Sequence, residues 1–356
     1  SPHPLQCRLL CVLIRGSTLF FEKATTHMAI RIRARQNESA GQMLRRFKKL
    51  CEKSDREGFK HMFIFFGSLF LFGYLAWMTW GSWWSLIFFL IYGNIYSCSD
   101  ALWHETGHKT AFRSKFWNQF FYKISSFMNN FEPVRWRWSH YKHHGHTAYA
   151  EPLDFEIVIR KPTDLIFFLS LFVPFGGVLF FHKSLQMETI KHAMGITTEV
   201  MEHCIPEKER SKCRNSARIH VGIWIIVIVS SMLYQTWLPM LYLILPKFYG
   251  NTLQVLFGLT QHVGLYEDIK DHRYSTRTVY LNPVFSFLYW KMEYHIEHHM
   301  FPNVPSYNLH KLHQMLQDQM PPAKKGLWEA YREIVPAVIR QAKNPDYKIS
   351  LSVPKT

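Results

Sequence analysis

The sequence predicts an all-α integral membrane protein with two transmembrane helical hairpins, about four spans in all, and a histidine-rich cap on the cytoplasmic side. Hydrophobic residues make up 48% of the 356 residues and aromatic residues 16%, with 29 Phe and 12 Trp, which is more large apolar surface than a soluble globule needs. The mean hydropathy is nevertheless slightly negative, because apolar runs alternate with charged, histidine-bearing segments. Helices are expected in the apolar runs, since a lipid-exposed backbone must satisfy its own hydrogen bonds.

The first hairpin is expected from two apolar runs, residues 62–80 and 83–101. The link between them, "WGSWW" at 80–84, is short and rich in Trp, as is typical of a turn at the membrane surface. Basic residues outnumber acidic ones before residue 60, so the N-terminal segment is placed in the cytoplasm. The second span then returns to the cytoplasm and ends beside His104.

The next apolar run, residues 165–181, is the shortest and carries Pro174, Gly176 and Gly177. A polar, charged stretch follows it at 183–217. This run is therefore interpreted as re-entrant or interfacial, since irregular backbone at membrane depth needs protein or water around it.

Residues 219–237 and about 238–258 are expected to form the second hairpin, turning at "TWLP" (236–239). This count of spans puts every histidine cluster on the cytoplasmic face. Near the C-terminus, residues 325–335 have the apolar spacing of a surface helix.

Three regions follow from these features: a basic cytoplasmic segment at 1–58, a membrane-embedded domain at 59–318 and a cytoplasmic tail at 319–356. The net charge is +16, and basic residues crowd beside the apolar runs. This favours anionic lipid headgroups over nucleic acid as the partner. The six Cys include no C-x-x-C pair, which argues against a disulfide framework or an iron–sulfur centre.

Three histidine clusters are the strongest functional signal. They are "HETGH" at 104–108, "HYKHH" at 140–144 and "HIEHH" at 295–299. Residues three and four apart share a helix face, and neutral imidazole binds iron, zinc, copper or nickel. Eight imidazoles exceed the needs of one zinc ion and suit two metal ions, with a possible ninth ligand in "TQHVG" (260–264). The candidate ligands are His104, His108, His140, His143, His144, His262, His295, His298 and His299.

Other classes of protein share parts of this pattern. H-E-x-x-H at 104–108 is also the zinc metalloprotease signature, with Glu105 as general base, so an intramembrane zinc protease is a remote alternative. That interpretation leaves both H-x-x-H-H clusters unexplained. A haem protein needs axial histidines inside its spans, whereas these histidines lie at span ends. A non-catalytic scaffold or metal sensor is the third alternative.

The clusters "HETGH" and "HYKHH", together with "EYHIEHHMFP" (293–302), resemble the three histidine boxes of the membrane fatty acid desaturase and hydroxylase superfamily. The resemblance covers about residues 59–318. It is nearest to the bacterial-type desaturase-like branch, which has counterparts of "QHVGL" (261–265) and "NVPSYNL" (303–309). The acyl-CoA desaturases have four residues between the histidines of their first box, so the three found here disfavour an acyl-CoA substrate.

The resemblance implies a non-haem di-iron centre with about nine nitrogen ligands, which correspond to the nine histidines above. It further implies an oxidoreductase that uses O2 and two external electrons to desaturate a fatty acyl chain of a lipid. Hydroxylation of an alkyl or N-methyl group is the alternative. The electrons would come from a separate cytochrome b5- or ferredoxin-type protein. The membrane would be the endoplasmic reticulum in a eukaryote and the inner membrane in a bacterium.

Metal-bound imidazoles usually donate their second N–H to a carboxylate or carbonyl. The candidate partners are Asp100, which shares a helix face with His104, and Glu105, Asp154 and Glu297. The arginines of "RWRW" (135–138), with Arg273 and Arg277, either hold an anionic headgroup or anchor the chain at the interface.

Overall fold

The fold is described from a computed structural model of the chain, for residues 10–15, 18–23, 26–33, 37–150, 153–156 and 165–354. From Ala40 onward every extended regular element of the described residues is a helix, which agrees with the predicted helical class. Before it lie three short antiparallel strands in the order β1-β2-β3, which the sequence analysis did not anticipate. The strands are β1 (Leu10–Arg15), β2 (Thr18–Lys23) and β3 (Thr26–Arg33).

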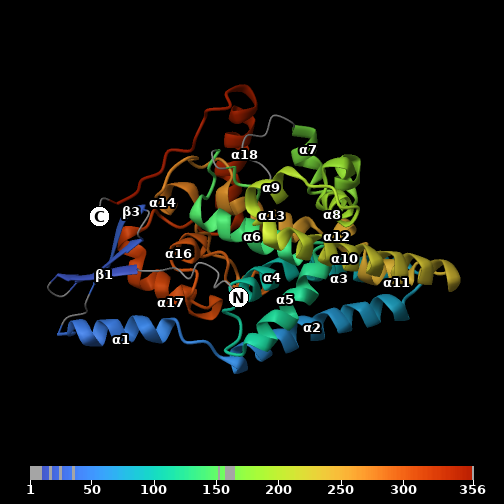
Figure 1. Cartoon of the computed structure of the whole chain (residues 1–356), viewed down its shortest axis with the longest axis horizontal. Helices are drawn as coiled ribbons and strands as arrows, with labels where there is room; N and C mark the ends of the chain where they lie inside the picture. The colour runs from blue at the N-terminus through green and yellow to red at the C-terminus, as the bar shows by residue number, and fades with distance from the viewer. Residues whose placement is uncertain are drawn as a thin grey trace.

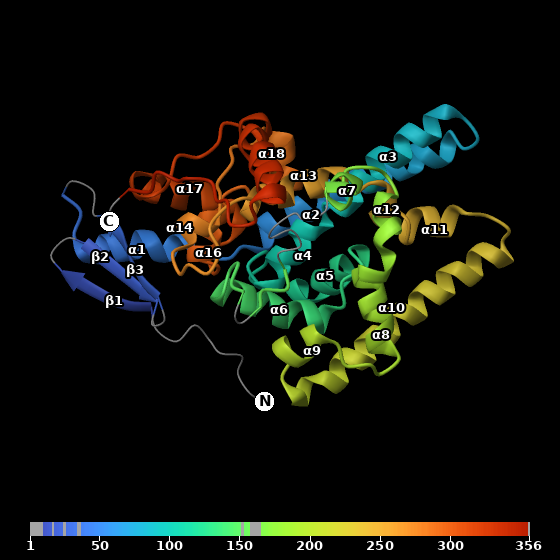
Figure 2. The same ribbon diagram turned by 90° about the horizontal axis from the view of Figure 1, so that it is seen from above.

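Among the described residues, three helical stretches are long and apolar enough to cross a membrane: Ala40–Met78, Trp83–Gly107 and Glu207–Leu233. The first joins α1 (Ala40–Leu50) and α2 (Asp55–Met78), and the second joins α3 (Trp83–Ser97) and α4 (Ser99–Gly107). Both views show α2, α3, α10 (Glu207–Leu233) and α11 (Leu238–Leu243) projecting on one side, away from the strands (Figures 1 and 2).

The surface of these projecting helices is apolar. Phe63 on α2 is 83% exposed and Trp83 at the start of α3 is 85% exposed, which is costly in water and favourable in lipid. Gly81, with φ 84°, makes the tight turn between α2 and α3. The structure therefore has the apolar helices of an integral membrane protein, while the number of crossings and their sidedness remain predictions.

The expected fourth span, residues 238–258, is not one continuous helix. It is divided into α11, α12 (Pro246–Tyr249) and α13 (Thr252–His262). Pro246 has no N–H to continue the hydrogen bonding of α11. Gly250 then packs against the backbone of Gly93, so closely that an added Cβ would lie 2.0 Å from the Gly93 carbonyl carbon. The expected continuous helix is thus broken where α12 packs against α3, and crossing of the membrane by this run stays a prediction.

The run expected to be re-entrant or interfacial is also broken. It contains α7 (Leu165–Ser170) and a 3-10 helix, η1 (Gly176–Lys183), with Phe175 in the left-handed region at φ 62° between them. Neither piece is long enough to cross a bilayer as a helix.

The C-terminal helix, α18 (Leu327–Lys343), is longer than expected from residues 325–335. Its outer face is exposed, with Trp328 at 76%, but Ala330, Ile334 and Val338 are buried. These three residues are four apart, so they share one face, and they pack in a cluster with Val263 beside α13. One face of the helix is therefore exposed, and the opposite face packs against the rest of the protein.

The remaining helices surround the middle of the molecule, where α4, α6, α13 and α16 meet (Figure 1). The largest apolar cluster lies under this region and joins α1, α2 and α3 to α16 and α17. The bounds are α5 (Lys115–Met128), α6 (Pro133–Gly145), α8 (Leu185–Ala193), α9 (Glu199–Cys204), α14 (His272–Ser275), α15 (Pro283–Leu288), α16 (His295–Met300), α17 (Ser306–Leu316) and η2 (Gln317–Gln319).

The contact between α12 and α3 gives a first prediction. Gly250→Ala places a Cβ inside the Gly93 backbone, so the helices must separate, at a cost of about 1–3 kcal/mol or more. We expect a clearly lower melting temperature for the detergent-purified variant. Gly222→Ala on α10 is the matched control, because a Cβ there meets no atom within 4 Å. Equal melting temperatures for the two variants would contradict this packing.

Candidate metal centre

Four helices carry the nine predicted histidine ligands into one buried region. The end of α4 supplies two histidines and the end of α13 supplies one. Helices α6 and α16 supply three histidines each. α6 begins where its sequence predicts a helix start: Pro133 occupies the first turn, and the Glu132 carboxylate accepts hydrogen bonds from the N–H groups of Val134 and Arg135.

The nine histidines form two groups, and within each group the ligand atoms all lie within 4.8 Å of one another. The first group draws five side chains from α4, α6 and α16. The second draws four from α6, α13 and α16. The first group is His104, His108, His140, His144 and His298, and the second is His143, His262, His295 and His299.

The Nε2 atoms point at each other within each group. In the first, the Nε2 atoms of His104 and His298 are 2.7 Å apart, as are those of His108 and His140. In the second, the Nε2 atom of His295 lies 3.1 Å from that of His262 and 3.0 Å from that of His299. Convergent imidazole nitrogens drawn from separate helices are the donor set of a transition-metal site, so the residues present fit two metal ions.

Several Nδ1 atoms are engaged on the outside, which leaves Nε2 free to bind a metal. His143 Nδ1 lies 2.7 Å from Asp154 Oδ2, and His140 Nδ1 lies 2.7 Å from Glu156 Oε2. His262 Nδ1 reaches the Ser275 carbonyl at 2.8 Å. His299 Nδ1 lies 3.0 Å from Thr147 Oγ1.

Electrostatics keep most of these imidazoles neutral. Burial, and then the neighbouring imidazoles, hold the pKa of His144, His298 and His299 well below the ordinary value of 6.5. Burial lowers the pKa of His262 to about 3. His143 is the exception: burial acts to lower its pKa, but the Asp154 carboxylate outweighs this and raises it. Neutral imidazole is the form that binds metals.

Of the four carboxylates predicted to support the ligands, only Asp154 contacts a predicted ligand, His143. Asp100 instead accepts a hydrogen bond from Gln254 Nε2 at 3.1 Å. Glu297 binds His313 Nδ1 at 2.6 Å and accepts from Thr278 Oγ1 at 2.9 Å. Position 297 lies roughly opposite the histidine face of α16, at 100° per residue, which explains why its carboxylate faces away from both groups.

Glu105, the general base of the protease alternative, also faces elsewhere. It is fully buried, and its Oε1 accepts a hydrogen bond from the Ser306 N–H at the start of α17, at 3.0 Å. A general base must reach the metal-bound water, so this orientation argues against a protease role for "HETGH".

Of the four arginines considered for headgroup binding, Arg135, Arg273 and Arg277 are buried in ion pairs. Arg137 is half-buried and donates to Gln119 Oε1 at 3.0 Å. Arg135 pairs with Glu188 at 2.6 Å, Arg273 with Asp271 at 2.7 Å and Arg277 with Glu333 at 3.0 Å. Their role is thus internal, which neither sequence interpretation anticipated. Arg135 also donates to Ser139 Oγ, which donates to Glu156 Oε1 behind His140.

Sequence reasoning missed Glu156 and Thr147 as partners of the histidines. Glu156 lies two residues after Asp154 in "LDFE", and this repeated acid after the second histidine cluster was an available signal. No sequence signal pointed to the Ser275 carbonyl or to Thr147, because every residue has a backbone carbonyl and a single Thr in a loop carries no pattern.

The family model for fatty acid desaturases matches residues 79–331, which is most of the chain. With the histidine geometry above, this match shows that the chain belongs to the fatty acid desaturase family, as the histidine boxes predicted. It is thereby placed among oxidoreductases associated with lipid substrates and membranes. No curated protein sequence matches the chain significantly.

The outer hydrogen bonds give a second prediction. Asp154→Asn removes the charge behind His143, so metal affinity of the four-histidine group should fall about 10–100-fold. The five-histidine group should keep its metal. Chelator titration followed by elemental mass spectrometry measures this, with exposed Glu207→Gln on α10 as control. Loss of both metals at one chelator concentration would contradict two separately supported groups.

A third prediction concerns pH. As pH falls through about 6.5, unfolded histidines take up protons, whereas the folded groups with lowered pKa stay neutral. The unfolded state then binds more protons, so the stability of the chelated protein falls on acidification. His143, whose pKa is raised, acts in the opposite direction, but the imidazoles with lowered pKa outnumber it. We expect the melting temperature of the chelated protein to drop between pH 7.5 and 5.5, and an unchanged value would contradict the burial of neutral imidazoles.

Proposed function

We propose that this protein is a membrane-bound non-haem di-iron oxidoreductase that uses O2 and two external electrons to desaturate a fatty acyl chain. The observation that carries the proposal is the convergence of nine imidazoles into two groups in a chain of the fatty acid desaturase family. The reaction balances as –CH2–CH2– + O2 + 2e⁻ + 2H⁺ giving –CH=CH– + 2H2O. The electrons come from a cytochrome b5- or ferredoxin-type protein.

Two iron ions, held by the five and the four histidines, supply the O2-dependent oxidising power that an unactivated C–H bond requires and side chains lack. The chain's own residues do the rest. Asp154 and Glu156 hold the rings of His143 and His140 by their Nδ1 atoms. Burial of His295 and His299, at 1% and 0% exposed, keeps bulk water away from this part of the four-histidine group.

The location of the site supports a membrane-embedded substrate. α4 continues α3, one of the apolar helices, and carries His104 directly. An acyl chain of a membrane lipid would then reach the first histidine group directly from the bilayer. With the basic N-terminal segment in the cytoplasm, the site faces the cytoplasm, at the endoplasmic reticulum of a eukaryote or the inner membrane of a bacterium.

Hydroxylation of an alkyl or N-methyl group would use the same ions and electrons, as R–H + O2 + 2e⁻ + 2H⁺ giving R–OH + H2O. The two reactions differ in what happens to the substrate after the first hydrogen is removed: desaturation removes a second hydrogen, and hydroxylation adds oxygen. Analysis of the lipid products by mass spectrometry separates them: desaturation loses two mass units, and hydroxylation gains sixteen.

A fourth prediction tests the proposal. His143→Ala removes a ligand of the four-histidine group, so we expect about two irons per chain in the wild type and loss of at least one in the variant. Product formation should fall at least about 100-fold, because both ions are needed. Lys212→Gln, an exposed change on α10, should keep iron and activity. A single zinc per chain that survives His143→Ala would overturn the proposal.

A further inference from the structure

The exposed face of the C-terminal helix α18 combines apolar and basic side chains. Trp328, Val335 and Ile339 are exposed, at 76%, 42% and 48%. At 100° per residue, these three lie within about 40° of one another around the helix axis. Arg332 and Lys343 are exposed on the same side of the helix. These five residues form an outer stripe whose apolar part is unfavourable to leave in water.

The outer stripe is positively charged. Arg332 and Lys343 form no ion pair with a carboxylate in the described part of the chain, because the nearby acid Glu333 is turned inward and pairs with Arg277. Glu329 is exposed, but it directly follows the first residue of the stripe and is therefore turned about 100° away from it. The charge on the stripe favours contact with an anionic surface.

A second exposed apolar surface, on α7, lies beside α18. Phe168 of α7 is buried in the same cluster as Ala330 and Val338 of α18, and both views draw the two helices near each other (Figures 1 and 2). The outer side of α7 exposes Ile166 and Leu169, at 72% and 62%. α7 belongs to the run expected at the membrane interface, so the outer stripe of α18 adjoins a surface that lipid is expected to cover.

The inner side of α18 is fixed to the end of α13. Glu333 of α18 pairs with Arg277 at 3.0 Å. The Arg277 guanidinium in turn donates to the carbonyls of Thr260 and Val263, at 2.7 and 3.1 Å. These two carbonyls lie on either side of His262 in the sequence. α18 is therefore held at the end of α13, where the expected fourth span meets the membrane surface.

We propose that the outer stripe of α18 lies on the membrane surface, with its apolar residues among the lipids and its two basic residues at the headgroups of anionic lipids. An apolar face that carries Trp, flanked by Lys and Arg, is the composition of a helix lying in the membrane interface. The tail predicted to be cytoplasmic is then a membrane-contacting element, which holds the end of α13 at the bilayer surface. This inference depends on the chain being a membrane protein, and not on the identity of the metal or the reaction.

Photo-crosslinking of the full chain tests this in vesicles of phosphatidylcholine, a neutral lipid, mixed with phosphatidylglycerol, an anionic lipid. The photoreactive residue p-benzoylphenylalanine replaces Ile339 in the stripe, and mass spectrometry of the digested protein identifies the captured lipid. The matched control places the same probe at Arg340, which is also exposed but is turned about 100° away and contacts the Tyr347 hydroxyl at 2.8 Å. A probe at Phe63, 83% exposed on α2, is the positive control for capture of lipid.

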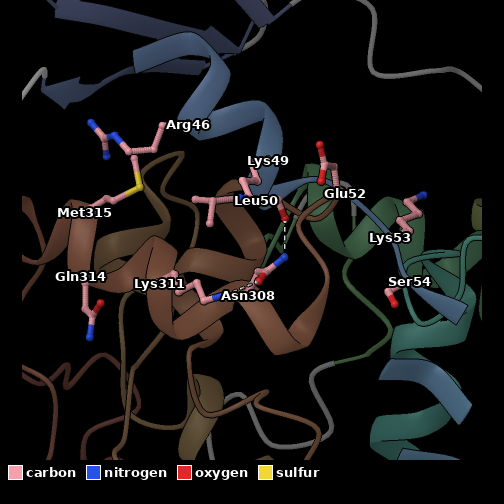
Figure 3. Close-up of a pocket in the computed structure, with 10 residues that line it drawn as sticks. All are labelled: Arg46, Lys49, Leu50, Glu52, Lys53, Ser54, Asn308, Lys311, Gln314 and Met315. Atoms are coloured by element: carbon pink, nitrogen blue, oxygen red, sulfur yellow. Dashed lines mark hydrogen bonds between the residues drawn. The ribbon is translucent and has the colours of Figure 1, made fainter. Parts of the chain in front are cut away.

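We expect the probe at position 339 to capture lipid about fivefold or more above the probe at position 340, because only the stripe faces the bilayer. Arg332→Gln with Lys343→Gln should lower the share of phosphatidylglycerol among the adducts about twofold or more. The charge-matched control, Lys49→Gln with Lys311→Gln, should leave that share unchanged. Figure 3 shows these two lysines at a hollow between the end of α1 and α17, away from α18.

Equal capture of lipid at positions 339 and 340 would overturn the proposal, as would capture by the Phe63 probe with none at position 339. Crosslinked pairs of chains at position 339, without lipid, would also overturn it and would make this face an interface between two copies. An unchanged share of phosphatidylglycerol in the double variant on α18 would contradict the role of its basic residues. Capture of lipid needs neither iron nor turnover, so failure here is distinguishable from failure of the di-iron function.

Discussion

The structure depends on a single constraint: nine imidazoles must be brought together, most of them buried, into two groups of converging ring nitrogens. Nε2 atoms only 2.7 Å apart, as between His108 and His140, leave no room for a proton on each ring. Nine rings in this arrangement, six of them buried, are costly unless a cation lies between them. The arrangement is therefore stable when the imidazoles bind metal ions, and it is unfavourable when no cation is bound.

Much of the surrounding architecture serves this constraint. The acids Asp154 and Glu156 follow α6 at the distance needed to reach back to His143 and His140. Arg135, itself held by Glu188, supports Glu156 through Ser139. These hydrogen bonds fix which ring nitrogen of His140 and His143 faces the metal.

The sequence was most informative where local spacing decides the outcome. Histidines three and four apart on α6 and α16 must share a face, and that face is the one turned inward. Two outcomes depend on tertiary contacts that the sequence does not reveal. The expected fourth span is broken near Gly250, which packs against Gly93. Asp100 accepts a hydrogen bond from Gln254 instead of supporting His104. Glu156 was missed because the path of the loop after α6 is not encoded in residue spacing.

The most direct test of the account is X-ray absorption spectroscopy at the iron edge on the purified, iron-loaded protein. Imidazole ligands give a nitrogen-only first shell with the outer-shell scattering of histidine rings. The account predicts this signature for two irons per chain, with several rings on each. An iron shell dominated by carboxylate oxygen or sulfur, or a protein that takes up one tetrahedral zinc and no iron, would contradict it.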